Sequence, residues 1–198
     1  MARNERVILA SGSPRRRDLL RGLGLEFEIL AAPGAETPHP ELTPEALVQA
    51  LAADKAAQVL ALDGDRQAVI IAADTVVEID GAVLGKPRDR DQAEEMLASL
   101  SGRTHRVWTG VCVRRGDEVL IRAECTEVEF RELSGPEIRA YVNTGEPLDK
   151  AGAYGIQGLA AVFVDKLAGD YYNVVGLPLC AAAGMLRRAG VPLLEALS

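Results

Sequence analysis

Aromatic residues are scarce in this chain: phenylalanine, tryptophan and tyrosine together make up 4% of its 198 residues. Single-stranded nucleic acid is commonly bound by stacking its bases on exposed aromatic rings. Positive charge is also in deficit, because 22 lysines and arginines face 29 aspartates and glutamates, for a net charge of −7. A protein of this charge has no general attraction for nucleic acid or for an anionic membrane. We therefore expect neither as a partner, and an anionic ligand would need a locally basic site or a metal ion.

Cysteines and long apolar runs are equally sparse. The three cysteines, Cys112, Cys125 and Cys180, form no Cys-x-x-Cys pair, which argues against a zinc site or a disulfide framework. We interpret them as buried thiols in a reducing cytosol. No apolar run reaches the length of about 18 residues that a membrane helix requires, and no apolar segment follows the charged N-terminus. We therefore expect a soluble, cytoplasmic protein.

Strands and helices alternate along the chain, with predicted hairpins between them. Apolar residues make up 48% of the chain, enough for a substantial core. Strands are expected at residues 7–9, 27–31, 68–73, 104–114, 118–130 and 160–164, and residues 76–79 are expected to continue extended to a hairpin turn at Asp80-Gly81. Helices are expected at 14–22, 43–62, 91–100, 134–145 and 177–189. This alternation indicates an α/β fold with a mixed sheet. No repeat, low-complexity linker or clear domain boundary is visible, so residues 1–198 are treated as a single domain.

The segment Gly145–Gly158 is too polar and too rich in glycine for a packed helix or a central strand. Its four glycines permit positive φ angles and a close approach of backbone to ligand. It also carries a carboxylate, an ammonium, a phenol and a carboxamide, on Asp149, Lys150, Tyr154 and Gln157. Loops of this composition usually carry function.

A second candidate is the turn Ser11-Gly12-Ser13, which leads into a helix with Ser13 as N-cap and Pro14 at its first position. Such a helix N-terminus suits phosphate. The three arginines at 15–17 oppose the helix dipole unless an anion is bound, and Arg15 lies nearest the turn. The alternative, with about equal weight in our estimate, is a solvated basic face.

Two charged residues lie next to or within apolar segments of the sequence. Asp74, with Thr75, directly follows the apolar run 68–73, where α/β proteins place ligands, metals or activated water. The alternative is that this aspartate caps the next turn. Lys55 lies on the apolar stripe of the helix at 43–62, so it either snorkels at the core edge or points into a cleft.

Other motifs exclude more than they indicate. Gly81–Pro87 resembles a P-loop but is one residue short, and a proline replaces the Ser/Thr that would hold Mg²⁺, so Lys86 remains only as a fixed cation. His105 has no obvious partner, and no catalytic triad is indicated. Any metal would be a hard ion, Mg²⁺ or Mn²⁺, held by carboxylates and phosphate oxygens.

Six sequence blocks together resemble the motif series of the Maf family, in the family's order. The blocks are Ala10–Arg16, Ala73–Val77, Gly85–Pro87, Gly102–His105, Asp149–Gly158 and Val174–Pro178. The resemblance implies a two-lobed α/β fold around a central cleft, similar to inosine triphosphate pyrophosphatases. It implies hydrolysis of a nucleoside triphosphate to the monophosphate and pyrophosphate with Mg²⁺ or Mn²⁺. The block around Gln157 looks like the branch acting on dTTP and UTP, and the resemblance is also compatible with a homodimer.

The resemblance also assigns roles residue by residue. Asp74 matches the family's proton acceptor, and Glu36 matches an acidic loop residue near the metal or water, so these two are the candidate metal ligands. Lys55 and Lys86 match the cleft lysines. The positions matched to substrate binding and choice are Ser11, Ser13, Arg15, Arg16, Thr75 and Gln157. Two other functions stay open: a nucleotide-binding regulator of septum formation, and a broad house-cleaning pyrophosphatase for modified nucleotides.

Overall fold

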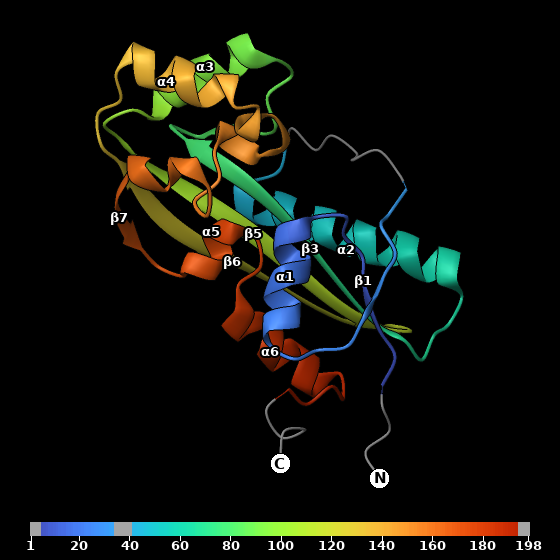
Figure 1. Cartoon of the computed structure of the whole chain (residues 1–198). Coiled ribbons are helices and arrows are strands. Elements are labelled where there is room, and N and C mark those ends of the chain that lie inside the picture. Colours follow the sequence, from blue (N-terminus) through green and yellow to red (C-terminus); the bar gives the residue numbers. More distant parts are fainter. Residues whose placement is uncertain (1–4, 34–40, 194–198) are drawn as a thin grey trace. The chain divides into compact units, whose positions relative to one another are not determined.

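A mixed β-sheet runs through the computed structural model, which describes residues 5–33 and 41–193 (Figure 1). Within these residues seven strands join one sheet in the order β2-β1-β3-β5-β6-β7, and β4 pairs with β3. β1 is parallel to β2 and β3, whereas β3–β4 and β6–β7 are antiparallel. The strands are β1 (Val7–Leu9), β2 (Glu28–Ile29), β3 (Val69–Ile79), β4 (Ala82–Leu84), β5 (Thr104–Arg115), β6 (Glu118–Phe130) and β7 (Val164–Ala168). The predicted α/β fold with a mixed sheet is confirmed.

The helices divide between two compact units of the chain. The first unit comprises residues 1–74, 109–124 and 176–198, and the second comprises 75–108 and 125–175. The first contains α1 (Pro14–Gly22), α2 (Pro44–Asp63) and α6 (Leu179–Arg188). The second contains α3 (Arg90–Leu100), α4 (Gly135–Asn143), α5 (Tyr171–Val175) and the short 3₁₀ helices η1 (Glu146–Asp149), η2 (Ala151–Ala153) and η3 (Leu159–Phe163).

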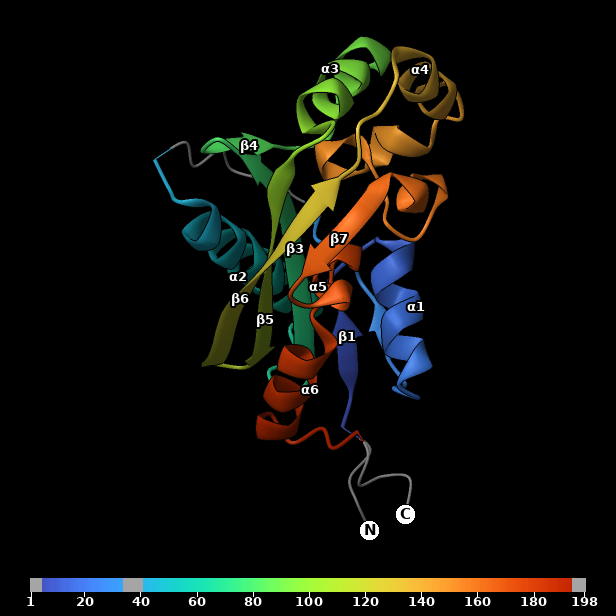
Figure 2. The same ribbon diagram turned by 90° about the vertical axis from the view of Figure 1, so that its left-hand side faces the viewer.

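In the first unit, helices cover both faces of the parallel strands. Alternate residues of β1 and β3 point to opposite faces, and the register pairs Val7 with Val69 and Leu9 with Ile71. These four side chains share a core cluster with α1 and α6, whereas Ile8 and its neighbours pack on α2. Figure 2 shows α1 and α2 on opposite sides of β1. This double coverage explains why both strands read as unbroken apolar runs.

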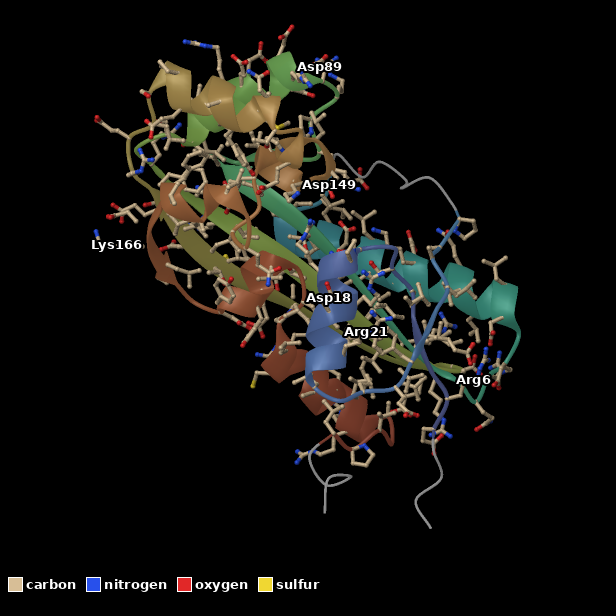
Figure 3. All side chains as sticks on the ribbon, viewed as in Figure 1. Arg6, Asp18, Arg21, Asp89, Asp149 and Lys166 are labelled. Atoms are coloured by element: carbon tan, nitrogen blue, oxygen red, sulfur yellow. The ribbon has the colours of Figure 1, made fainter. Side chains whose placement is uncertain are left out.

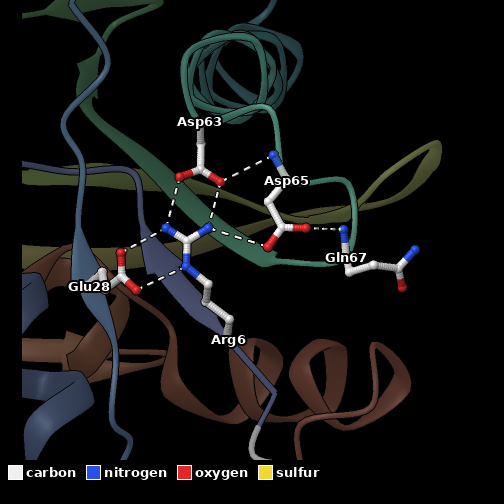
Figure 4. A network of polar contacts seen from close by, with 5 residues as sticks. All are labelled: Arg6, Glu28, Asp63, Asp65 and Gln67. Atoms are coloured by element: carbon white, nitrogen blue, oxygen red, sulfur yellow. Dashed lines mark hydrogen bonds and ion pairs between the residues drawn. The ribbon is translucent and has the colours of Figure 1, made fainter.

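A charged network ties the start of β1 to β2 and to the end of α2 (Figure 4). Arg6 donates to both oxygens of Glu28, at 2.9 and 2.8 Å, and to both oxygens of Asp63, at 2.7 and 2.8 Å. Asp65 accepts a further, longer bond at 3.4 Å. The hydrogen bonds from Arg6 lower the pKa of Glu28 and of Asp63, and those bonds raise the pKa of Arg6. This network fixes the edge of the first unit.

In the second unit, α3 and α4 pack against each other (Figures 1 and 2). α4 begins with a capping box: Ser134 Oγ accepts from the Glu137 N–H, and Glu137 Oε2 accepts from the Ser134 N–H at 3.0 Å. The hydrogen bonds from Arg131 and then Ser134 lower the pKa of Glu137 to about 2.

Several predicted elements are wrong in their bounds. The strand expected at 160–164 is instead η3, and the strand follows at β7, where Leu167 pairs with Val128 of β6. The strand expected at 27–31 is reduced to the two residues of β2. The last helix begins two residues late, because Pro178 occupies its N-cap. α5 was not predicted.

The interpretation of all three cysteines as buried thiols is also wrong. Cys112 is buried, Cys125 is half-buried and Cys180 is exposed, and all three are free thiols. Burial raises the pKa of the Cys112 thiol to about 11. Over the described residues, the helices are too short or too polar for any of them to cross a lipid bilayer.

Candidate functional site

Asp74 is a buried carboxylate inside a strand. The apolar run and the extended residues 76–79, expected as separate pieces, form one strand, β3, which continues through Asp74 and Thr75 to Ile79. Asp74 is 7% exposed. The ammonium of Lys55, on α2, donates to Asp74 Oδ1 in an ion pair. A buried carboxylate is costly unless it is paired, and Lys55 supplies that pairing within the strand.

The predicted turn at Ser11 lies at the same end of the sheet as Asp74. β1 and β3 are adjacent and parallel, and Leu9 pairs with Ile71. Beyond this pair of residues the two strands run in the same direction, β1 toward Ser11 and β3 toward Asp74. The turn then leads into α1 with Pro14 in its first turn, as predicted. Within the first unit, Lys55 thus meets Asp74, and the turn at Ser11 follows the strand adjacent to Asp74.

The arginines of α1 differ in their surroundings. Arg16 Nε donates to the carbonyl of Gly176 at 2.7 Å, and its Nη1 donates to Ser11 Oγ at 3.2 Å. Ser11 Oγ also accepts from the Ser13 N–H at 3.2 Å, so Arg16 holds the turn in place. Arg17 lies 3.4 Å from the carboxylate of Asp18, and Arg15 is half-buried. Protein acceptors therefore stabilise part of the charge that a bound anion would otherwise balance.

As predicted, the glycine-rich segment is neither a packed helix nor a central strand. It contains two short 3₁₀ turns, η1 and η2. Lys150 Nζ donates to the Glu146 carbonyl at 2.7 Å and to the carboxylate of Asp149, labelled in Figure 3, at 2.6 Å. The Gly152 N–H donates to the Gly85 carbonyl at 3.0 Å. That bond fixes the segment next to the loop that carries Lys86.

The remaining predicted site residues lie in the second unit or outside the described residues. Thr75 is half-buried on β3, and Lys86 is exposed just beyond β4. Gln157 is exposed on the glycine-rich segment. Glu36 lies outside the described residues.

The donor set for a metal ion is small. Within residues 5–33 and 41–193 no group of three or more His, Cys, Asp or Glu side chains could hold a metal. Mg²⁺ is commonly held by one or two carboxylates together with substrate phosphates and water. Asp74 fits such a shared site as a single protein ligand.

The sequence reasoning missed a buried pair, His105 and Tyr154. His105 is 2% exposed, and its Nε2 lies 2.8 Å from the Tyr154 hydroxyl. Both rings also contact Phe130 edge-on. Burial lowers the pKa of His105 to about 4. The alternation of β5 contained the signal, because His105 falls on the same buried face as Val107.

The fold and this site define an α/β protein in which a buried acid of β3 pairs with a lysine of α2, and the neighbouring parallel strand β1 leads into the N-terminus of α1. The chain belongs to the family of Maf-like proteins, whose model matches residues 6–189.

Curated relatives match almost the whole chain. It is 50% identical over 192 residues to the dTTP/UTP pyrophosphatase of Symbiobacterium thermophilum, covering 96% of each chain. It is 51% identical over 186 residues to that of Pelotomaculum thermopropionicum, covering 93% of this chain and 96% of the relative. Among solved structures, a nucleoside-triphosphatase (dITP/XTP pyrophosphatase) from Mycobacterium abscessus matches with a TM-score of 0.46 and 15% identity, over 97% of this chain and 98% of that one.

Proposed function

We propose that this protein is a nucleoside triphosphate pyrophosphatase that hydrolyses dTTP and UTP to the monophosphate and pyrophosphate. The observation that carries the proposal is the identity of about half of all residues, over nearly the full chain, with relatives named dTTP/UTP pyrophosphatase. The pairing of Asp74 with Lys55 supports a role for this acid in the reaction.

The proposed chemistry needs charge and positioning more than a covalent intermediate. Asp74 accepts a proton from the water that attacks the α-phosphorus, and the ion pair with Lys55 orients its carboxylate. Arg15 and the N-terminus of α1 stabilise phosphate oxygens. Lys86 supplies further positive charge. Thr75 and Gln157 are proposed to contact the nucleotide, and the carboxamide of Gln157 offers both a donor and an acceptor to a pyrimidine edge.

We further propose that a divalent cation, Mg²⁺ or Mn²⁺, binds Asp74 together with the substrate, and Glu36 is the second proposed ligand. Bound there, the cation would lower the pKa of water and neutralise the leaving pyrophosphate. We also propose a cytoplasmic location, where nucleoside triphosphates are found, and a homodimer as the assembly.

The test is a panel of canonical and modified nucleoside triphosphates, each incubated with the protein and Mg²⁺ or Mn²⁺ while pyrophosphate release is measured. The proposal expects dTTP and UTP to give the highest kcat/KM. Saturable nucleotide binding without pyrophosphate would favour the regulator of septum formation. A preference for modified nucleotides would favour the house-cleaning enzyme.

A further inference from the structure

A carboxylate beneath the glycine-rich segment holds the backbone on both sides of Gln157. Glu146 Oε2 accepts from the Leu159 N–H at 3.1 Å, two residues after Gln157. Its other oxygen, Oε1, accepts from the Tyr141 hydroxyl at 3.0 Å. The same hydroxyl accepts from the Gly155 N–H at 3.3 Å, two residues before Gln157. Tyr141 and Glu146 thus form a bridge between the two ends of the segment Gly155–Leu159.

The segment between these two anchors is a tight turn. The Gly158 N–H donates to the Gly155 carbonyl at 3.0 Å. Gly158 has no room for a side chain, because a Cβ there would overlap the Glu146 carboxylate. Tyr141 itself is 4% exposed, and its ring packs edge-on against Phe163 at a centroid distance of 5.2 Å. The anchors are therefore fixed by the core of the second unit, while Gln157 is exposed on the turn.

We infer that Glu146, with Tyr141, is a positioning residue for base selection: it fixes the height and direction from which Gln157 meets the nucleobase. This inference rests on the proposed function, in which Gln157 contacts the base. A rigid backbone fixes how far the carboxamide reaches. A purine, whose edge extends farther from the ribose than that of a pyrimidine, then meets Gln157 at the wrong distance.

The substitution Glu146→Gln probes the bridge with little change in shape. Two donors, the Tyr141 hydroxyl and the Leu159 N–H, face the two carboxylate oxygens, whereas a carboxamide has only one acceptor oxygen. One anchor therefore loses its bond. Glu137→Gln is the matched control, because Glu137 also accepts from a backbone N–H in the same unit but lies in the capping box of α4.

The measurement is the ratio of kcat/KM for UTP to that for GTP, with thermal unfolding recorded in parallel. We expect Glu146→Gln to lower this ratio by about tenfold or more, since small misplacements of a contact group are costly. Glu137→Gln lowers the melting temperature and leaves the ratio unchanged. Gln157→Ala lowers the ratio, and adding Glu146→Gln to it changes the ratio no further. Tyr141→Phe lowers the ratio like Glu146→Gln.

An unchanged ratio in Glu146→Gln, including an equal loss of kcat/KM for both nucleotides, would overturn the inference. Additive effects of Gln157→Ala and Glu146→Gln on the ratio would also overturn it. If the wild-type protein releases no pyrophosphate from UTP, the proposed function fails on its own. The same variants are then compared by calorimetric binding of the α,β-imido analogues of UTP and GTP. The inference is supported if the wild-type protein prefers the uridine analogue and Glu146→Gln weakens that preference. It is overturned if the wild-type protein shows no such preference.

Discussion

The ammonium of Lys55 and the carboxylate of Asp74 form an ion pair between α2 and β3, although the residues lie 19 positions apart in the sequence. Both side chains are largely buried, with 19% and 10% of their surface exposed. Lys55 lies on the helical stripe that otherwise packs into the core, and its charge is directed at Asp74 of β3. This pair joins the proposed catalytic acid to the core of the first unit.

Replacing Asp74 with asparagine keeps the shape of the side chain and removes its charge. We expect pyrophosphate release to fall by at least about 100-fold, because general acid–base groups typically contribute that much. The fold should persist, as judged by circular dichroism. Asp18→Asn, on the exposed surface of α1 (Figure 3), is the matched control and should retain wild-type turnover. Near-normal activity in Asp74→Asn would remove Asp74 from the mechanism.

The buried His105 makes stability depend on pH. Its pKa is about 4 in the folded protein, because burial disfavours the charged ring, against about 6.5 when unfolded. The unfolded chain therefore binds the proton first as the pH falls. This stabilisation is complete above pH 6.5 and is lost progressively down to pH 4, by about 3 kcal/mol.

Denaturant unfolding of the wild-type protein and of His105→Gln, between pH 7.5 and pH 5, checks this expectation. The glutamine can still hydrogen-bond Tyr154 but does not titrate. The free energy of unfolding should fall with pH more steeply in the wild-type protein than in the variant. Parallel curves would show that His105 does not carry the dependence.

Gly152 is the point where the glycine-rich segment touches β3. Its φ is +65°, and a Cβ there would lie 2.7 Å from Val77 Cγ2. Gly152→Ala should cost about 1–2 kcal/mol for the left-handed backbone and about 1–3 kcal/mol for the overlap. Combining it with Val77→Ala would relieve only the overlap. The measured quantity is the free energy of unfolding of the three variants, and no coupling between the two sites would contradict the contact.

The cysteines should differ sharply in reactivity toward a thiol reagent such as DTNB. Cys180 is exposed, whereas Cys112 is buried with a pKa of about 11, and the thiolate is the reactive form. We expect Cys180 to react within the native protein and Cys112 only after unfolding. Cys180→Ser should remove the fastest phase. Rapid native labelling of Cys112, mapped by mass spectrometry, would contradict the burial of β5.

Local signals in the sequence predicted the fold well where they act over a few residues. Ser13 with Pro14 marked a helix start that the structure confirms, and the helix expected at 43–62 begins at Pro44. Lys55 on an apolar stripe left two interpretations open, a side chain that snorkels at the core edge or one that points into a cleft, and in the structure its partner is Asp74. That partner could not be read from the sequence, because the pairing joins two elements that meet only in the folded chain.

The missed features share this dependence on distant contacts. The apolar run 159–163 suits a strand or a helical turn equally, so the spacing of its apolar residues could not distinguish the two structures. Residues 164–168 form the strand β7 because they pair with β6, a contact between segments far apart in the sequence. Likewise, nothing near Glu146 in the sequence indicates that its carboxylate would hold the backbone of Leu159, 13 positions away.

The most direct test of the proposed reaction is hydrolysis of UTP in water labelled with ¹⁸O, with both products examined by mass spectrometry. Attack of water at the α-phosphorus predicts one ¹⁸O atom in the UMP and none in the pyrophosphate. Label in the pyrophosphate, or release of UDP and orthophosphate in place of UMP, would contradict the account.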